Sequence, residues 1–314
     1  MTPKHHINIS VVIPVLNEAE IIEQSILRVR KVLQGLRTTY EIVVVDDGSS
    51  DLTLKKLIKL KKDIVQLRII KLARNVGHMN AIAVGLASAK GMYVVTIDGD
   101  MQDPPEKIAE MYQIAKSNHD IDVVQAVRID RSTDTVFKRT SASIFYRMAV
   151  SMTGIPVIPN AADYRLLKRH VVDFLVKLPE KNKVYRLLIP YFGFNVWLID
   201  IKREQRIGGK SKYPLSKMLS LTMNSFISFS TKPLQFFMKI GLLFSGFFFL
   251  AALASVWIWW SGIWSFVPGW TSVIFILLMS NSLVIAAIGL VGEYVARTYM
   301  QSLDRPSIKY HEIS

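Results

Sequence analysis

An acidic motif, DGDMQDPP, begins at Asp98 and directly follows an apolar, β-branched run. Such a run is typical of a buried strand, so the acidic residues are expected at the strand's carboxyl end. Ligands bind at this edge of open α/β sheets, and carboxylate oxygens suit Mg²⁺ or Mn²⁺ that holds a diphosphate. We predict that Asp98 and Asp100 belong to a site of this kind. Asp103 is instead predicted to cap a helix that begins at Pro104.

A second acidic cluster stands in the same relation to another predicted strand. The apolar run at residues 41–45 leads into Asp46 and Asp47, followed by Gly, two Ser and a further Asp. Because the carboxyl ends of parallel strands meet at one edge of a sheet, one crevice is expected to receive both clusters. This pairing favours a ligand site at Asp98 and Asp100 over the alternative of an ordinary acidic turn.

Strand patterns alternate with helix patterns along the first two thirds of the chain. Predicted strands lie at residues 7–13, 41–45, 67–72, 92–97, 122–127, 164–167 and 194–202. Predicted helices lie at residues 17–35, 79–89, 105–116 and 137–152, with a Lys-rich helix after residue 51. This order predicts an α/β domain whose mostly parallel sheet has helices on both faces. No G-x-G-x-x-G motif follows the first strand, which argues against a dinucleotide-binding Rossmann domain and a P-loop.

Two long uncharged stretches follow, at residues 240–260 and 271–292. At about 1.5 Å per residue each stretch spans roughly 30 Å, the thickness of the hydrocarbon core of a bilayer. We predict two transmembrane helices. A pair of buried core helices is the alternative, but helices of globular proteins rarely lack a polar face over this length.

The basic residues around this hairpin predict its orientation. Lys and Arg flank both ends of the hairpin but are absent from its turn at residues 261–270. By the positive-inside rule both ends lie in the cytosol, and no signal peptide is visible in the first ten residues. We therefore expect a multi-pass protein of the inner (plasma) membrane with its N-terminal domain and both termini in the cytosol.

The chain is strongly basic and lacks cysteine. It carries 39 Lys and Arg against 25 Asp and Glu, a net charge of +14, and no Cys. Beside a membrane hairpin, this charge favours lipid head groups and phosphate substrates over nucleic acid as partners. The absence of Cys excludes disulfides and thiolate chemistry.

From Arg128 onward the chain turns basic, with Arg131 and Arg139 in a segment that is expected between the sheet and the membrane. As a group these residues favour an anion site, although a solvated helix face is the alternative for any one of them. A second basic segment, at residues 203–213, is a glycine-hinged loop. The apolar spacing at residues 215–230 predicts a membrane-surface helix, with a core helix as the alternative.

Six short motifs, taken in order, resemble one known family. They are VVIPVLNE at residues 11–18, VDDGS at 45–49, RNVG at 74–77, DGDMQDPPE at 98–106, DYRL at 163–166 and GKSKY at 209–213. Together they resemble the membrane-bound polyprenyl-phosphate glycosyltransferases of family 2, which have the GT-A fold and include dolichol-phosphate mannose synthase and the bactoprenol glucosyltransferases. SFSTKPL at 228–234 and GLVGEYVARTY at 289–299 resemble the bactoprenol branch. The likeness thus covers nearly the whole chain.

The resemblance implies roles for particular residues. The pocket for the nucleotide sugar would be lined by Pro14, Asn17, Glu18, Asp46, Asp47 and Asp98. Asp100 and Gln102 would ligate Mg²⁺ or Mn²⁺. The acceptor phosphate would be bound by Arg128, Arg131, Arg139, Arg206, Ser211 and Lys212. The implied catalytic residues are Asp98, Asp100 and Asp163, of which Asp163 would orient the acceptor or shape the sugar pocket.

The implied architecture has four parts. They are a cytosolic GT-A domain at residues 1–209, an amphipathic juxtamembrane segment at 210–236, a transmembrane hairpin at 237–296 and a cytosolic tail at 297–314. The implied activity is metal-dependent, inverting transfer of a hexose from a nucleotide sugar to a polyprenyl phosphate at the cytosolic membrane face. UDP-glucose and undecaprenyl phosphate are the favoured substrates, and a homo-oligomer is expected.

Other functions are compatible with parts of this pattern. A dolichol-phosphate-mannose-type synthase would use GDP-mannose, and a membrane-anchored nucleotide-sugar binder would keep the pocket without catalysis. A processive polysaccharide synthase is disfavoured because the Gln-x-x-Arg-Trp motif is absent. A transporter is disfavoured because neither predicted span carries a charge.

Overall fold

The computed structural model describes residues 7–129, 158–180, 183–204, 269–302 and 309–313, with single positions between 239 and 261. The chain divides into two compact units. The first unit comprises Met1–Val150, Gly154–Tyr213 and Pro306–Ser314, and the second comprises Ser151–Thr153 and Pro214–Arg305. The predicted helices at 137–152 and 215–230 lie outside the described residues.

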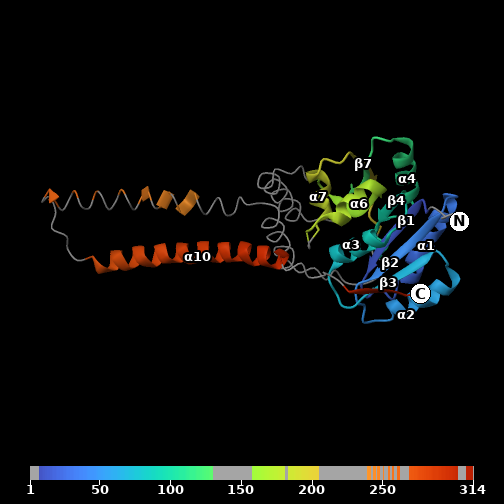
Figure 1. Cartoon of the computed structure of the whole chain (residues 1–314), viewed down its shortest axis with the longest axis horizontal. Coiled ribbons are helices and arrows are strands. Elements are labelled where there is room, and N and C mark those ends of the chain that lie inside the picture. Colours follow the sequence, from blue (N-terminus) through green and yellow to red (C-terminus); the bar gives the residue numbers. More distant parts are fainter. Residues whose placement is uncertain are drawn as a thin grey trace. The chain divides into compact units, whose positions relative to one another are not determined.

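The described strands of the first unit form one sheet (Figure 1). Their bounds are β1 (Ile9–Val15), β2 (Tyr40–Asp46), β3 (Leu67–Leu72), β4 (Tyr93–Thr96), β5 (Val123–Arg128), β6 (Ala161–Lys168), β7 (Val196–Ile201) and β8 (Tyr310–Ile313). In the described part the sheet has eight strands in the order β7-β5-β6-β4-β1-β2-β3-β8. Strands β4, β1, β2 and β3 pair in parallel, as do β5 and β7, whereas β6 and β8 run antiparallel to their neighbours. The predicted α/β class with a mostly parallel sheet is confirmed.

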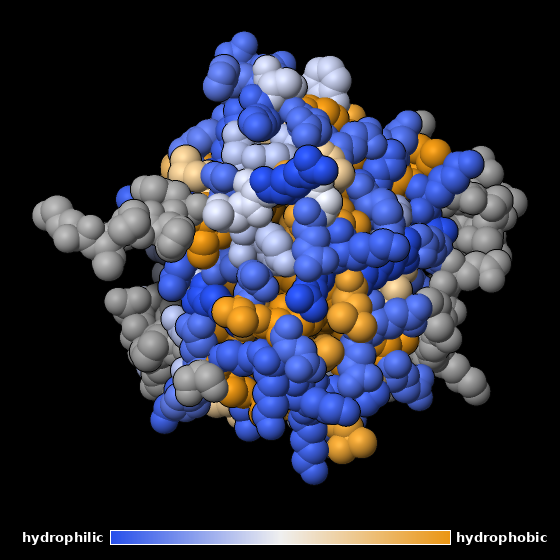
Figure 2. Space-filling model, turned by 90° about the vertical axis from the view of Figure 1, so that its right-hand side faces the viewer, coloured by the Kyte–Doolittle hydropathy of each residue, from blue (hydrophilic) through white to orange (hydrophobic). Residues whose placement is uncertain are grey.

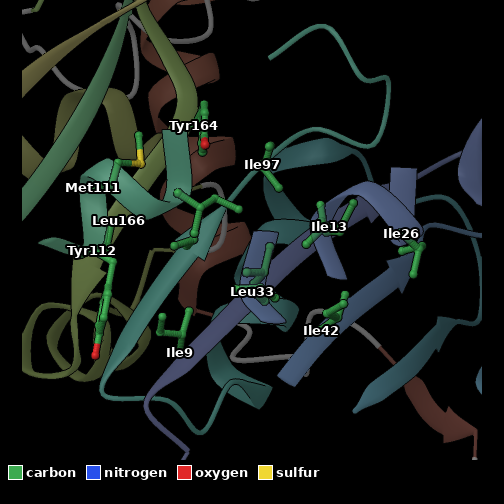
Figure 3. Close-up of a cluster of buried hydrophobic side chains, with 14 of the residues drawn as sticks. Ile9, Ile13, Ile26, Leu33, Ile42, Ile97, Met111, Tyr112, Tyr164 and Leu166 are labelled. Atoms are coloured by element: carbon green, nitrogen blue, oxygen red, sulfur yellow. The ribbon is translucent and has the colours of Figure 1, made fainter. Parts of the chain in front are cut away.

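Helices cover both faces of this sheet. Their bounds are α1 (Ile22–Gly35), α2 (Thr53–Asp63), α3 (His78–Ser88), α4 (Lys107–Ser117), α6 (Arg169–Lys177) and α7 (Tyr185–Tyr191). On one face, Ile9 and Ile13 of β1 belong to the same buried cluster as Ile26 and Leu33 of α1 (Figure 3). Apolar residues recur along α1 at helical spacing, which gives the helix the stripe that it buries.

Helix α3 packs against the opposite face at very close range. A Cβ on Gly85 would lie 2.2 Å from Cγ1 of Val12 and 3.2 Å from Cγ2 of Val45. Val12 alternates with Ile13 along β1, so α3 and α1 lie on opposite sides of the sheet. Glycine at this position lets α3 approach β1 and β2 closely, and β2 leads into the acidic cluster at Asp46 and Asp47.

The C-terminal strand β8 completes the sheet beside β3 (Figure 1). The guanidinium of Arg68 in β3 binds the Glu312 carboxylate at 2.7 and 3.0 Å, across 244 positions of sequence. The same guanidinium binds buried Glu41 of β2 at 2.7 Å, and Lys61 binds the backbone oxygen of Ile313. The sequence analysis did not predict this strand, nor helices α6 and α7.

The second unit contains a long helix, α10 (Trp270–Ser302), of 33 residues. It includes all of the uncharged stretch at 271–292. Several of its apolar side chains are exposed, among them Ile285, Ile288 and Val295. Within the described part of the chain, no helix combines the length and the apolar character that crossing a membrane requires.

One face of the molecule is mostly hydrophilic, with a group of hydrophobic residues near its centre (Figure 2).

Candidate active site

The two acidic clusters meet at one edge of the sheet. Strand β1 lies between β2 and β4 and is parallel to both, with Val15 opposite Asp46 and Val12 opposite Thr96. Both clusters follow directly after the carboxyl ends of these strands. The edge that the sequence predicted for ligand binding thus carries residues 46–51 and 98–103 together.

The loop after β1 is fastened to the loop after β2. Asn17 has a left-handed backbone, with φ of +55°, and its side-chain oxygen accepts the backbone N–H of Ser50 at 2.8 Å. The N–H of Glu18 donates to Thr53 Oγ1 at 2.9 Å, and Pro14 is buried in β1. The predicted pocket residues Asn17 and Glu18 therefore join the two loops into one wall beside Asp46, and Pro14 stands in the strand that leads to it.

Asp46 presents a buried acceptor atom at this wall. Its side chain is fully buried, and Oδ1 accepts the N–H of Ser49 at 3.1 Å. Its Oδ2 has no hydrogen-bond partner among the described residues. An unpaired buried carboxylate oxygen is costly, so this atom is a natural acceptor for an N–H or O–H group of a ligand.

Asp47 is held by the chain itself. Its two carboxylate oxygens accept the backbone N–H groups of Val76, at 2.7 Å, and Gly77, at 3.0 Å. Burial raises the pKa of Asp47. The two backbone N–H groups favour the charged carboxylate and act in the opposite direction, but burial has the larger effect. The side chain therefore fixes the start of α3 to the end of β2.

His78 brings two predicted catalytic carboxylates into one cluster. It is the first residue of α3, and its Nε2 lies 3.3 Å from Oδ1 of Asp98 and 3.9 Å from Oδ2 of Asp163. Burial raises the pKa of Asp98 to about 6. The charges of Asp163 and Asp100 add to this rise, whereas His78 opposes it. The imidazole thus offsets part of the repulsion between the carboxylates.

Two arginines also form ion pairs with Asp163. Arg165 is buried and binds Oδ1 of Asp163 at 2.7 Å, and Arg186 of α7 lies 3.6 Å from Oδ2. Burial acts to raise the pKa of Asp163, but the net shift is downward because these guanidinium groups stabilise the carboxylate. Asp163 is therefore an ionised, ion-paired carboxylate at the edge of the site, which makes it a weak proton acceptor.

Asp100 and Gln102 lie on either side of a strained turn. Met101 between them has φ of +58°, a left-handed conformation that a non-glycine residue rarely adopts. The N–H of Gln102 donates to Oδ1 of Asp100 at 3.1 Å, and its carbonyl accepts the N–H of Glu204 at 2.8 Å. Strain of this kind persists only where surrounding contacts enforce it, and it is common at functional sites.

The oxygens at this turn suit a cation that is shared with a nucleotide. Within the described part of the chain, no three His, Cys, Asp or Glu side chains form a metal-binding group. Mg²⁺ in nucleotide sites is commonly held by one or two carboxylates together with substrate phosphates. Asp100 keeps acceptor capacity beyond its one bond to Gln102. The pair fits a divalent cation whose remaining ligands come from the substrate.

Asp103 does not cap α4, so this prediction was wrong. The helix begins at Lys107 with Glu106 at its N-cap, and the N–H of Lys107 donates to the carbonyl of Pro104 at 3.2 Å. The buried carboxylate of Asp103 instead binds the guanidinium of Arg128 at 2.9 and 3.3 Å. Arg128, predicted to bind the acceptor phosphate, therefore has a protein partner already, and Asp103 fixes its position next to the acidic turn.

The remaining predicted acceptor residues lie outside the described residues. They are Arg131, Arg139, Arg206, Ser211 and Lys212. The sequence analysis assigned no role to His78, Arg165 or Arg186. His78 directly follows the recognised RNVG motif and Arg165 is part of the recognised DYRL motif, whereas Arg186 carried no local signal.

Comparison with known proteins identifies the family. Residues 10–175 match the family described as Glycosyl transferase family 2. The chain is 38 % identical over 303 residues to the uncharacterized glycosyltransferase YkcC of Bacillus subtilis (strain 168), covering 96 % of this chain and 92 % of the relative. It is 32 % identical over 307 residues to a prophage bactoprenol glucosyl transferase homolog of Escherichia coli (strain K12), covering 95 % and 96 %.

A solved structure shares the fold. Glucosyl-3-phosphoglycerate synthase from Mycobacterium tuberculosis, in complex with Mn²⁺ and UDP-glucose, superposes with a TM-score of 0.50 at 20 % identity, over 70 % of this chain and 77 % of that chain. The first unit therefore has a GT-A-like fold, as the resemblance implied. The chain belongs to glycosyltransferase family 2.

Proposed function

We propose that this glycosyltransferase moves a hexose from a nucleotide sugar to a polyprenyl phosphate at the cytosolic face of the inner membrane. The proposal rests above all on the 32 % identity to the bactoprenol glucosyl transferase homolog, which extends over 95 % of this chain. That extent includes both uncharged stretches, at 240–260 and 271–292. UDP-glucose and undecaprenyl phosphate are the substrates that this relationship favours.

The acidic edge of the sheet is suited to the donor. The buried Oδ2 of Asp46 would accept a hydrogen bond from the nucleoside, beside the wall formed by Asn17 and Glu18. Asp100 and Gln102 would hold Mg²⁺ or Mn²⁺ together with the diphosphate, and the related synthase from Mycobacterium tuberculosis binds Mn²⁺ with UDP-glucose. The cation would stabilise the charge that develops on the leaving diphosphate.

The chemistry needs placement more than it needs a base. A phosphate monoester has its second pKa near 6, so the acceptor is already largely deprotonated at neutral pH. Its oxygen would attack the anomeric carbon as the bond to the diphosphate breaks, with inversion of configuration. Asp163, ionised and bound by Arg165 and Arg186, would orient the acceptor or shape the sugar pocket.

Bringing two anions together requires positive charge. Arg128 lies at this edge and is fixed by Asp103. The further residues proposed to bind the acceptor phosphate are Arg131, Arg139, Arg206, Ser211 and Lys212. A polyprenyl tail stays in the bilayer, so the hydrophobic hairpin would keep the site near the head groups. We also propose that the chain assembles as a homo-oligomer with both termini in the cytosol.

An assay with the full-length chain in membranes tests the proposal. Undecaprenyl phosphate is incubated with UDP-glucose, UDP-galactose, UDP-N-acetylglucosamine or GDP-mannose, and the lipid product is identified by mass. The expected result is one lipid-phosphate hexose that requires Mg²⁺ or Mn²⁺. Transfer from GDP-mannose alone would point to the dolichol-phosphate-mannose-type activity. Binding of nucleotide without transfer from any donor would point to a non-catalytic binder and overturn the proposal.

A further inference from the structure

Arg28 of α1 binds two carboxylates at once, from two distant parts of the chain. Its Nε and Nη2 donate to Glu106 at 2.8 Å each, and its Nη1 and Nη2 donate to Glu204 at 2.8 and 2.6 Å. Glu106 stands at the start of α4, and Glu204 follows β7. The two bidentate pairs use the guanidinium's donors in the fork geometry that favours carboxylates. We call Arg28, Glu106 and Glu204 the clasp.

The clasp is joined to the acidic turn at two points of the main chain. Glu106 closes the motif that begins at Asp98. Glu204 donates its backbone N–H to the carbonyl of Gln102 at 2.8 Å. The guanidinium therefore holds the end of the motif directly at Glu106, and it holds the turn at Gln102 through the main chain of Glu204.

The turn needs such support. Met101 has a left-handed backbone that is unfavourable for its side chain, and Met101, Gln102 and Asp103 are all buried. Other contacts hold the same segment, since Asp103 binds Arg128 and the carbonyl of Pro104 accepts the hydroxyl of Tyr164 at 3.1 Å. Among these contacts, the bond from Glu204 is made to the residue that follows the strained position.

We infer that Arg28 is a positioning residue for the donor site: by holding Glu204 and Glu106 it keeps Asp100 and Gln102 in the geometry that receives the cation and diphosphate. This inference rests on the proposed use of a nucleotide sugar. Arg28 itself touches no substrate. Its loss would leave the fold in place while loosening the strained turn, so donor binding would suffer more than overall stability.

The test compares donor binding with thermal stability in the full-length chain in detergent. Calorimetry gives the Kd for UDP, and in parallel GDP, in the presence of Mn²⁺, and a melting curve gives Tm. The variants are Arg28→Ala, Glu204→Ala and the double variant, with Arg28→Lys as the conservative change. Glu110→Ala is the matched control, because it removes a 2.6 Å ion pair with Lys107 on α4 that lies outside the clasp.

Arg28→Ala and Glu204→Ala are each expected to raise the Kd for nucleotide about fivefold to tenfold, while Glu110→Ala leaves it unchanged. The double variant is expected to match the single ones, because both remove the same support. Arg28→Lys is expected to recover part of the affinity. Equal losses of Tm with unchanged Kd would show that the clasp is structural only and would overturn the inference.

Separate measurements of nucleotide binding and of sugar transfer distinguish a failure of this inference from a failure of the proposed function. If the parent chain binds UDP or GDP but transfers no sugar to undecaprenyl phosphate, the proposed function fails while the comparison of Kd values still judges the clasp. If the parent chain binds neither nucleotide, the inference about the clasp and the proposed function are both overturned.

Discussion

The imidazole Nε2 of His78 lies 3.3 Å from the carboxylate of Asp98 and 3.9 Å from that of Asp163. These residues come from the start of α3, the turn after β4 and strand β6, so one side chain connects three elements. A donor between two carboxylates of like charge lowers their mutual repulsion. His78 therefore positions two of the carboxylates that the resemblance implies to be catalytic.

His78→Ala is predicted to lower kcat about tenfold, because both carboxylates lose a common partner and shift relative to the substrate. Steady-state transfer kinetics measure the change. His170→Ala is the control, since His170 of α6 makes a 2.8 Å contact with Asp122 away from the acidic edge. Equal loss of activity in the two variants would contradict a specific role for His78.

Asp100→Asn is predicted to reduce transfer more than about a hundredfold, because the turn loses the charge that holds the cation. Excess chelator is expected to abolish transfer by the parent chain, with recovery on adding Mn²⁺ or Mg²⁺. Asp63→Asn, at the exposed end of α2, is the control. Full activity of Asp100→Asn, or activity that survives the chelator, would remove Asp100 from the metal site.

Gly85→Ala is predicted to destabilise the fold by about 1 to 3 kcal/mol, because the new methyl group would lie 2.2 Å from the Val12 side chain. The free energy of unfolding from a denaturant titration measures this cost. Gly35→Ala is the matched control: no atom lies within 4 Å of its added Cβ, and it is expected to stabilise by up to about 1 kcal/mol. Equal stability of the two variants would mean that α3 moves away from the sheet without cost.

Asp103→Ala is predicted to cost about 2 kcal/mol of stability, because the half-buried guanidinium of Arg128 loses a buried partner. Asp173→Ala removes the exposed ion pair with Arg169 on α6 and should cost less than about 0.5 kcal/mol. Thermal melting of both variants makes the comparison. If Asp103 were a helix cap, Asp103→Ala would lower stability but Asp103→Asn would not, since Asn caps helices as well as Asp does.

The pair between Glu312 and Arg68 predicts how stability depends on pH. The hydrogen bond from Arg68 lowers the pKa of Glu312 below its usual 4.5. A lowered pKa in the folded state contributes stability above the unfolded pKa, and this contribution is lost as pH falls through the folded value. Glu312→Gln should therefore be less stable than the parent at pH 7, by less than about 1 kcal/mol because the pair is partly exposed. The difference should begin to shrink as pH falls towards 4.5 and should disappear once the pH is below the lowered pKa of Glu312; a difference that grows on acidification would contradict the assignment.

Much of the first unit could be predicted because its signals are local. The apolar runs of β1, β2 and β4 and the acidic residues after them are continuous in sequence, and parallel pairing brings their ends together. The direction of β6 could not be predicted, because its antiparallel pairing with β4 and β5 depends on how the intervening chain returns.

The missed features are contacts between distant residues. Asp103 and Arg128 are 25 positions apart, and the two prolines before α4 resembled a helix start strongly enough to hide their pairing. Arg28 looked like an ordinary polar residue of α1, although its partner Glu204 lies 176 positions away. His78 stood next to a recognised motif, but only the packing of α3 against the sheet brings it to Asp98.

Strand β8 also affects how the protein is made. Residues 310–313 pair with β3, so the N–H and C=O groups of β3 along that edge lack this partner until these residues have been synthesised. At about 5 to 20 residues per second, the intervening chain takes on the order of tens of seconds to synthesise. During that time the nascent sheet exposes an open edge to other chains. An insertion directly before residue 310 or after residue 313 would therefore act on the pairing of this edge.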